Sequence, residues 1–143
     1  HCLPVGVALT GANADERQVL LDILHADPTL VADRAGQTVI GDKNYYGRDF
    51  ETALTDAGIR LLRPARKGEP ERGGARFLKP LRQTAESIFD TYKGQLDLEA
   101  HGGKTPAGVL VRVLQRVLAL TAAIWHNDHT GQPVRRSLLA YDH

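Results

Sequence analysis

The sequence is poor in cysteine, in long apolar runs and in net charge, and each shortage excludes a class of protein. Cys2 is the single cysteine among 143 residues, which rules out an internal disulfide framework and a cysteine-rich zinc site and suits a reducing compartment. The apolar runs fall short of the ~20 residues that cross a bilayer, and no secretory signal is present. With 42% hydrophobic and 24% charged residues, we expect a cytoplasmic chain of one globular domain with no membrane partner.

The formal net charge of +1 hides an uneven distribution of charge along the chain. Between Arg60 and Arg82, eight basic residues stand against two acidic ones, a local charge of +6 that leaves −5 for the remainder. Such a stretch, with its centre in a glycine-containing loop over residues 64–77, is typical of a contact with a polyanion, and nucleic acid is the commonest one. A solvated basic loop without a partner explains the same composition.

Hydrophobic periodicity and turn residues predict strands that alternate with helices. Gly41-Asp42 and Pro64 each end a short strand, and Thr105-Pro106 is a helix start with threonine as the N-cap. Strands separated by helices favour an α/β sheet in which the second and third strands pair in parallel. The predicted strands are residues 3–9, 38–40 and 59–62, and the predicted helices run from the N-cap Asn13 to Asp27, over 50–57 before Gly58, over 78–98, and from Thr105 to about Trp125.

The helix predicted over 78–98 carries an apolar stripe, which needs a core, and a charged stripe beside it. At about 100° per residue, Glu86 lies about 40° from Arg82, and Lys93 returns to within about 20° of Glu86. A carboxylate between two cations forms either a surface ion-pair ladder or an acidic ligand with phosphate-binding neighbours. Gly94 marks a weakened turn or a kink in this helix.

Asp42 and Glu86 are the carboxylates whose predicted positions suit a metal site. Hard divalent cations such as Mg²⁺ take oxygen ligands from separate elements and keep positions for water and phosphate. Asp42 follows a predicted strand and Glu86 lies on a predicted helix, which fits such a site. A Gly-Asp turn and a solvated helical glutamate are the plainer interpretation of the same residues.

Other residues whose side chains are able to bind metal, stack on bases or react are assigned structural roles. His126 and His129 have the spacing of metal ligands, but they follow a predicted helix end and lack a third ligand, so we assign them capping or surface roles. Trp125 is predicted to lie in a core rather than to stack on a base. Cys2, on a predicted strand, is expected to be a small buried hydrophobe.

Two motifs, taken together, resemble those of bacterial DDE-type insertion-sequence transposases. The string GDKNYYG over residues 41–47 is similar to the segment around the second catalytic aspartate of that family, and the spacing of Arg82, Glu86 and Lys93 is similar to its R-(3)-E-(6)-K signature. The likeness covers nearly the whole chain and points to the C-terminal half of such an enzyme. It extends to LPVGVALTGANADER near the start and to the run from KGQLDLEAHGGKTP through LALTAAIWHN to RRSLLAYDH.

The resemblance implies a partial RNase H-like fold of order β-α-β-α-β-α-α, which lacks the first two strands. It implies a site of three acids and two Mg²⁺ or Mn²⁺ ions that cleaves DNA at transposon ends and joins it to target DNA, in a homo-oligomer associated with the bacterial nucleoid. Asp42 then is the second acid and Glu86 the third, both as metal ligands. The residues expected to contact DNA are Arg82, Lys93, Arg63, Arg66, Lys67, Arg76 and Lys79.

Three departures from the family pattern accompany this likeness. Lys79 stands where the fuller signature has a tyrosine, and Asn44 stands where glycine is usual. The first acid is expected on a strand before His1, since no Asp or Glu precedes Asp15. A non-catalytic remnant that binds DNA nonspecifically through the basic loop is the alternative, and a small α/β domain whose charges serve solubility is a third interpretation.

Overall fold

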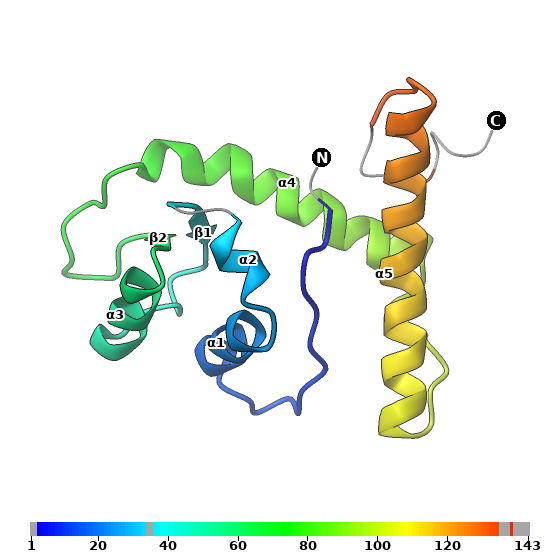
Figure 1. Ribbon diagram of the computed structural model, residues 1–143, viewed down its shortest axis with the longest axis horizontal. Coiled ribbons are helices and arrows are strands. Elements are labelled where there is room, and N and C mark those ends of the chain that lie inside the picture. Colours follow the sequence, from blue (N-terminus) through cyan, green and yellow to red (C-terminus); the bar gives the residue numbers. More distant parts are fainter. Residues whose placement is uncertain (1–2, 34–35, 135–137, 139–143) are drawn as a thin grey trace. The chain divides into compact units, whose positions relative to one another are not determined.

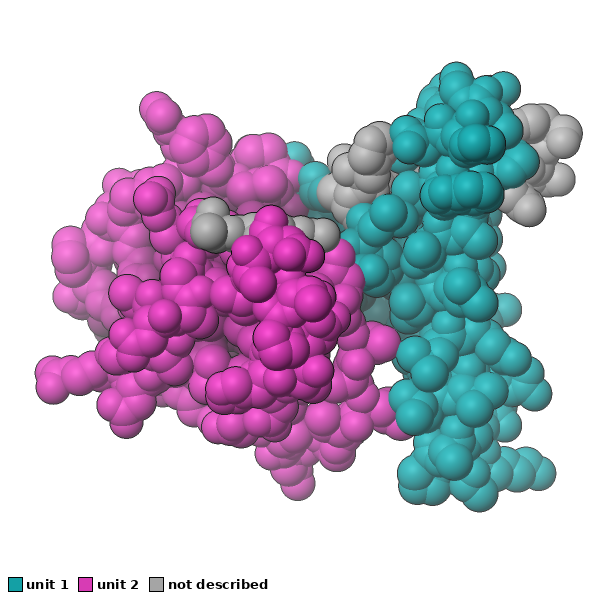
Figure 2. Space-filling view, viewed as in Figure 1, with its two compact units in different colours: residues 1–4, 82–143 teal, residues 5–81 magenta. Residues whose placement is uncertain are grey.

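The computed structural model describes residues 3–33, 36–134 and 138, and it divides into two compact units. One unit comprises residues 5–81, and the other comprises His1–Pro4 with Arg82–His143 (Figure 2). Each unit has its own buried core. The expectation of one domain over the whole chain stays a prediction.

The unit of residues 5–81 contains a small parallel sheet and the helices around it (Figure 1). The strands β1 (Thr38–Ile40) and β2 (Arg60–Leu62) pair in parallel, with Val39 opposite Leu61. This pairing confirms the predicted second and third strands and is compatible with the α/β class. The helices of this unit are α1 (Glu16–Ala26), α2 (Thr29–Ala32) and α3 (Arg48–Asp56), with a 3₁₀ turn, η1 (Ala75–Phe77), at its end.

The predicted first strand is wrong, because residues 3–10 pair with no strand. Leu3, Val5, Val7 and Leu9 alternate as in a strand, yet all four side chains are exposed. A strand exists only where a neighbour takes up its backbone hydrogen bonds. The segment therefore keeps the sequence pattern of a strand without becoming one.

Helix α1 begins two residues later than the sequence indicates. Its N-cap is Asp15 rather than Asn13, and the Asp15 carboxylate accepts a hydrogen bond from the backbone N–H of Arg17 at 2.9 Å. The Arg17 side chain lies 2.6 Å from the same carboxylate and, with that backbone N–H, lowers the pKa of Asp15 to about 2. An Asp at the N-cap satisfies N–H groups that the first helical turn leaves unpaired.

The core of this unit lies where α3 meets the sheet and α1. Phe50, Leu54 and Ile59 are buried there, and Gly58 between them takes a φ of +72° directly after α3. Glycine adopts this left-handed conformation without a steric cost, so it ends α3 and turns the chain into β2, as the sequence predicts. Partly buried residues of the same core are Leu20, Leu21, Leu24, Val31, Val39, Tyr45, Ala57 and Leu61.

Helix α4 (Leu78–Asp90) begins in the unit of residues 5–81 and continues into the unit that contains residues 82–143, where a π-helical turn, η2 (Thr91–Gln95), follows it. This irregular turn contains Gly94, which confirms the predicted weak point of the helix. A helix of 24 residues, α5 (Pro106–His129), completes the unit. Tyr92, Leu120 and Ile124 form its buried core.

The start of α5 is confirmed and its far end is not as predicted. Thr105 is the N-cap, and its hydroxyl accepts from the Gly108 N–H at 3.1 Å. The helix runs past Trp125 to His129, and the Trp125 side chain is 60% exposed and stacks on His129, so its predicted core position is wrong. The buried positions are Leu120, Ala123, Ile124 and Asn127, and Trp125, between the last two, is exposed.

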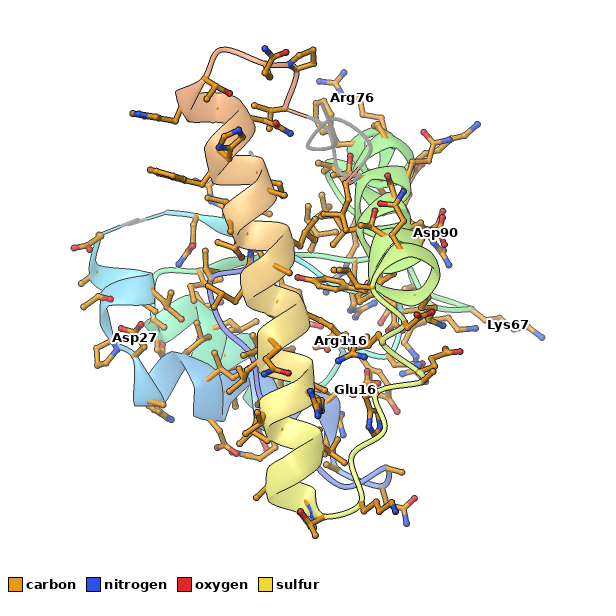
Figure 3. The ribbon with its side chains drawn as sticks, turned by 90° about the vertical axis from the view of Figure 1, so that its right-hand side faces the viewer. Glu16, Asp27, Lys67, Arg76, Asp90 and Arg116 are labelled. Carbon is orange, nitrogen blue, oxygen red and sulfur yellow. The ribbon has the colours of Figure 1, made fainter. Side chains whose placement is uncertain are left out.

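By length and composition, α5 also passes the test for a membrane-spanning helix, with a mean hydropathy of 1.7. Core helices of soluble proteins, which are mostly buried, and signal sequences share this length and composition, whereas 17% of the apolar stretch of α5 is buried. Arg116 on α5 donates hydrogen bonds to the carbonyls of Leu96 and Asp97 (Figure 3), and the helix packs on Tyr92, so polar and apolar groups of this chain serve as its partners. Cys2 lies outside the described residues.

Candidate functional site

Asp42 lies in a tight turn at the carboxyl end of β1. The Gly41 N–H extends the sheet by donating to the Leu62 carbonyl at 3.0 Å. One Asp42 carboxylate oxygen, Oδ1, accepts from the Asn44 N–H at 2.6 Å, and the Asp42 carbonyl accepts from the Tyr45 N–H. This arrangement is an Asx turn, which fixes the carboxylate by the backbone two residues on. Asn44 does not take a positive φ, so the turn forms without the conformation that glycine favours.

Two glycines of the GDKNYYG string are required by its geometry. A Cβ on Gly41 would lie 2.9 Å from the Cβ of Tyr45, closer than two carbon atoms can pack. The Tyr45 ring then packs near Phe50 in the core, with ring centroids 6.1 Å apart. Gly47 takes a φ of +132° and is the N-cap of α3. The turn that carries Asp42 is therefore anchored to the core at both ends.

Tyr46, in the same turn, is contacted by two arginines. The guanidinium carbon of Arg66 lies 3.6 Å from the centroid of the Tyr46 ring, and that of Arg17 lies 5.4 Å from it. Arg17 also donates to the Tyr46 carbonyl at 2.8 Å. These contacts join the basic loop of residues 64–77 and the start of α1 to the Asp42 turn. No pattern in the sequence indicates these contacts of Tyr46 and Arg17.

On α4, Glu86 and Arg82 form an exposed ion pair. Arg82 Nε lies 3.0 Å from Glu86 Oε1, one helical turn apart, and the Glu86 side chain is 58% exposed. Such surface pairs contribute under about 1 kcal/mol, so the pair does not prevent Glu86 from binding another group. Both functions of the charged stripe, ion pairing and ligand binding, remain compatible with this geometry.

The ion pair of Lys93 is with Glu99 rather than with Glu86. Lys93 lies within the π-helical turn η2, and its Nζ is 2.9 Å from Glu99 Oε1. The hydrogen bond with Glu99 raises the pKa of Lys93. The predicted angle to Glu86 assumed 3.6 residues per turn throughout, and a π-helical turn contains more. Lys93 therefore pairs with a residue beyond the helix.

The basic loop is fixed to α3 by a buried arginine. The Arg63 side chain is 2% exposed and donates to Glu51 Oε1 at 3.0 Å and to Glu69 Oε2 at 2.7 Å. Arg72 adds a 2.6 Å contact to the other Glu51 oxygen. The Arg63 side chain lowers the pKa of Glu69 to about 2. Arg63, which we expected to contact DNA, therefore has its guanidinium committed to two carboxylates inside the protein.

The remaining bases of the loop and of early α4 are exposed. Arg66, Lys67, Arg76 and Lys79 all have exposed side chains, and Lys67 and Arg76 are labelled in Figure 3. Arg76 also lies over the ring of Phe77, at 4.7 Å. Because Arg63 and Arg72 bind carboxylates, the positive charge that residues 64–79 offer to a partner comes from these four residues.

Asp42 and Glu86, the two candidate acids, belong to different units. Both carboxylates are exposed, and oxygen donors of this kind are what Mg²⁺ takes beside water and phosphate. Within the part of the chain that the structure describes, no group of three or more His, Cys, Asp or Glu residues could hold a metal ion. His126 and His129 lie in the last turn of α5 rather than beyond it, and they belong to no such group.

Comparison with known proteins gives one match. A family model described as the transposase DDE domain matches residues 1–122, which include both candidate acids and the whole basic loop. Neither the curated proteins nor the solved structures contain a significant match to this sequence.

Proposed function

This chain belongs to the transposase DDE domain family, and from that premise we propose that it carries two of the three acids of a site that cuts and joins DNA. Asp42 is the second acid and Glu86 the third. The observation that carries the proposal is the Asp42 turn, in which an Asx hydrogen bond and two glycines hold an exposed carboxylate at the end of a parallel strand. Ligands in α/β sheets bind at the carboxyl ends of strands.

The residues of this chain bind metal and phosphate in that mechanism. Two Mg²⁺ or Mn²⁺ ions would stabilise the attacking and leaving oxygens of an in-line displacement. Asp42 and Glu86 supply carboxylate oxygens to hold them, and Arg82, one turn from Glu86, neutralises a phosphate beside the scissile bond. Lys93 serves the same purpose from the π-helical turn. We propose transposon ends and target DNA as substrates, within a homo-oligomer of a bacterial enzyme.

A site of three acids needs one carboxylate besides Asp42 and Glu86. In this sequence no Asp or Glu precedes Asp15, so no acid lies on a strand before it. The family pattern places the remaining acid upstream of the Asp42 strand, so we propose that this chain corresponds to the C-terminal part of the catalytic domain, with an RNase H-like arrangement. The reading frame upstream of the codon for His1 tests this directly. A strand there with an Asp is expected, and a frame without one contradicts the proposal.

The catalytic assignment is tested by conservative variants in the protein that holds the full acid set. Asp42→Asn and Glu86→Gln keep size and hydrogen bonding but remove the metal-binding charge, so Mg²⁺-dependent strand cleavage and transfer should fall to background. Asp90→Asn, an exposed acid at the end of α4, is the matched control and should retain activity. Strand transfer that survives in either Asp42→Asn or Glu86→Gln refutes the assignment.

A second candidate function is sequence-independent DNA binding without catalysis. The exposed bases Arg66, Lys67 and Arg76, on a loop that Arg63 fixes to α3, favour it. Each phosphate contact contributes about 0.9 to the slope of log K against log salt, so replacing all three by Ala should lower the slope by about 2.7. Binding that is indifferent to salt, or to this triple variant, contradicts the loop as the DNA contact.

A further inference from the structure

Tyr46 and Arg66 form a contact that neither family motif explains. The Arg66 guanidinium carbon lies 3.6 Å from the centre of the Tyr46 ring, the distance of direct stacking. Tyr46 belongs to the turn that begins at Asp42, and its own N–H donates to the Asn44 carbonyl at 2.9 Å. The contact therefore joins the basic loop to the candidate metal-binding turn within one compact unit.

The two arginines at Tyr46 differ in what their N–H groups do. Arg17 donates from all three side-chain nitrogens, from Nε and one terminal nitrogen to Asp15 and from the other to the Tyr46 carbonyl. Arg66 uses its backbone N–H for Glu69 at 2.9 Å, and its guanidinium makes no hydrogen bond to any described residue. Stacking occupies the face of a guanidinium and leaves its edge, which holds the N–H donors, open to a ligand.

The Arg66 position is also fixed from its other side. Glu69 accepts from the Arg66 backbone and from the buried Arg63 side chain at the same time. A long side chain usually loses conformational freedom when it binds a partner. Here the Tyr46 ring restricts the Arg66 side chain, and Glu69 holds the Arg66 backbone, so a ligand that binds the guanidinium edge meets an oriented donor pair.

We propose that Tyr46 is a positioning residue, which holds the Arg66 guanidinium so that its edge binds a DNA phosphate beside the Asp42 turn. This inference rests on the proposed DNA binding and adds a residue outside the acids and bases assigned above. A phosphate is the expected ligand because two parallel N–H donors match two phosphate oxygens. The surrounding exposed bases, Lys67 and Arg76, supply the attraction that brings the DNA backbone to the loop.

The test is a double-mutant cycle on binding of the full chain to a labelled DNA duplex, measured by fluorescence anisotropy at several salt concentrations. Tyr46→Ala should weaken binding about two- to fivefold, the effect of losing one exposed cation–π contact, and Tyr46→Phe should restore the binding. Arg66→Ala should lower the salt slope by about 0.9. In the Arg66→Ala background, Tyr46→Ala should have no further effect.

Lys67 provides the matched control, because it is an exposed base beside Arg66 in the same loop. Lys67→Ala and Tyr46→Ala should act additively, since independent sites do not couple. Tyr46→Leu, which fills space without a ring face, replaces Tyr46→Ala if that variant does not fold, as judged by circular dichroism.

The outcomes separate this inference from the function on which it rests. If the duplex binds with a salt slope but Tyr46 and Arg66 act additively, or if Tyr46→Phe does not restore binding, the positioning role is wrong and DNA binding stands. If the chain shows no salt-dependent binding at all, both are wrong. Coupling between Tyr46 and Arg66 together with rescue by Phe supports the inference.

Discussion

Replacement of the buried Arg63 by methionine tests how the basic loop is held. Arg63 donates to two carboxylates and to the Pro64 carbonyl, and its side chain is almost fully buried. Removing one member of a fully buried ion pair costs about 3–5 kcal/mol. Glu51 and Glu69 are 30% and 35% exposed, so water can partly replace the lost arginine, and we expect about 2 kcal/mol.

The measurement is urea unfolding followed by circular dichroism, with Lys67→Met as the control. Both variants remove one positive charge from the same loop, but Lys67 is exposed and its loss should cost under about 0.5 kcal/mol. With a denaturant dependence of about 1.5 kcal/mol per molar, Arg63→Met should lower the urea midpoint by about 1 M. If the two variants unfold at the same midpoint, the Arg63 cluster does not hold the loop. A loosened loop should also weaken DNA binding, although the Arg63 guanidinium is itself paired with Glu51 and Glu69.

Two further perturbations test the acidic contacts and the Asp42 turn. The pKa of Glu69 is lowered from 4.5 to about 2 and that of Asp15 from 3.8 to about 2, so both contribute stability above their ordinary pKa values and lose it as the pH falls toward 2. The urea midpoint should therefore drop over this range, and Glu69→Gln or Asp15→Asn should flatten the drop; a drop unchanged in both variants contradicts the assignment. Gly41→Ala should destabilise the chain by about 1–3 kcal/mol, because the added Cβ would meet Tyr45 at 2.9 Å, and a thermal midpoint unchanged from that of the parent chain contradicts the packing.

Elements with strong local signals could be predicted from the sequence. Thr105-Pro106 marks the start of α5 because a hydroxyl cap and a residue without an N–H suit a first helical turn. Gly58 marks the end of α3 because it takes a positive φ. The short strands around them follow from aliphatic runs between such boundaries, and their parallel pairing follows from the helix that separates them.

Features that depend on distant partners could not be predicted. Arg63 looks like any other base of its stretch, and its burial depends on Glu51, which lies on a helix twelve positions earlier. The alternation in residues 3–9 indicates a strand but does not supply a neighbouring one. Trp125 is aromatic and adjacent in sequence to buried residues, yet its angular position around the α5 axis leaves its side chain exposed.

Of the candidate site, the sequence identifies the residue types but not their surroundings. Asp42 was located correctly after a strand, because Gly-Asp is a local signal of a strand end. The contacts of Tyr46 with Arg17 and Arg66 join residues far apart in the sequence, and no local pattern indicates them. Tyr46 lies between Arg17 and Arg66 only because the fold brings the basic loop and the start of α1 to it.

The π-helical turn at residues 91–95 has a consequence for alignments of related sequences. A turn of this kind is an α-helical turn that has taken up one extra residue, so the residues around it keep roughly the sides of the helix that they would have without the insertion. A relative with one residue fewer between Glu86 and Lys93 would therefore form an ordinary helix and still present its lysine on about the same side. The quantity to compare between relatives is thus the side of the helix on which the lysine emerges, and a one-residue gap at this point is a structural change rather than an alignment error.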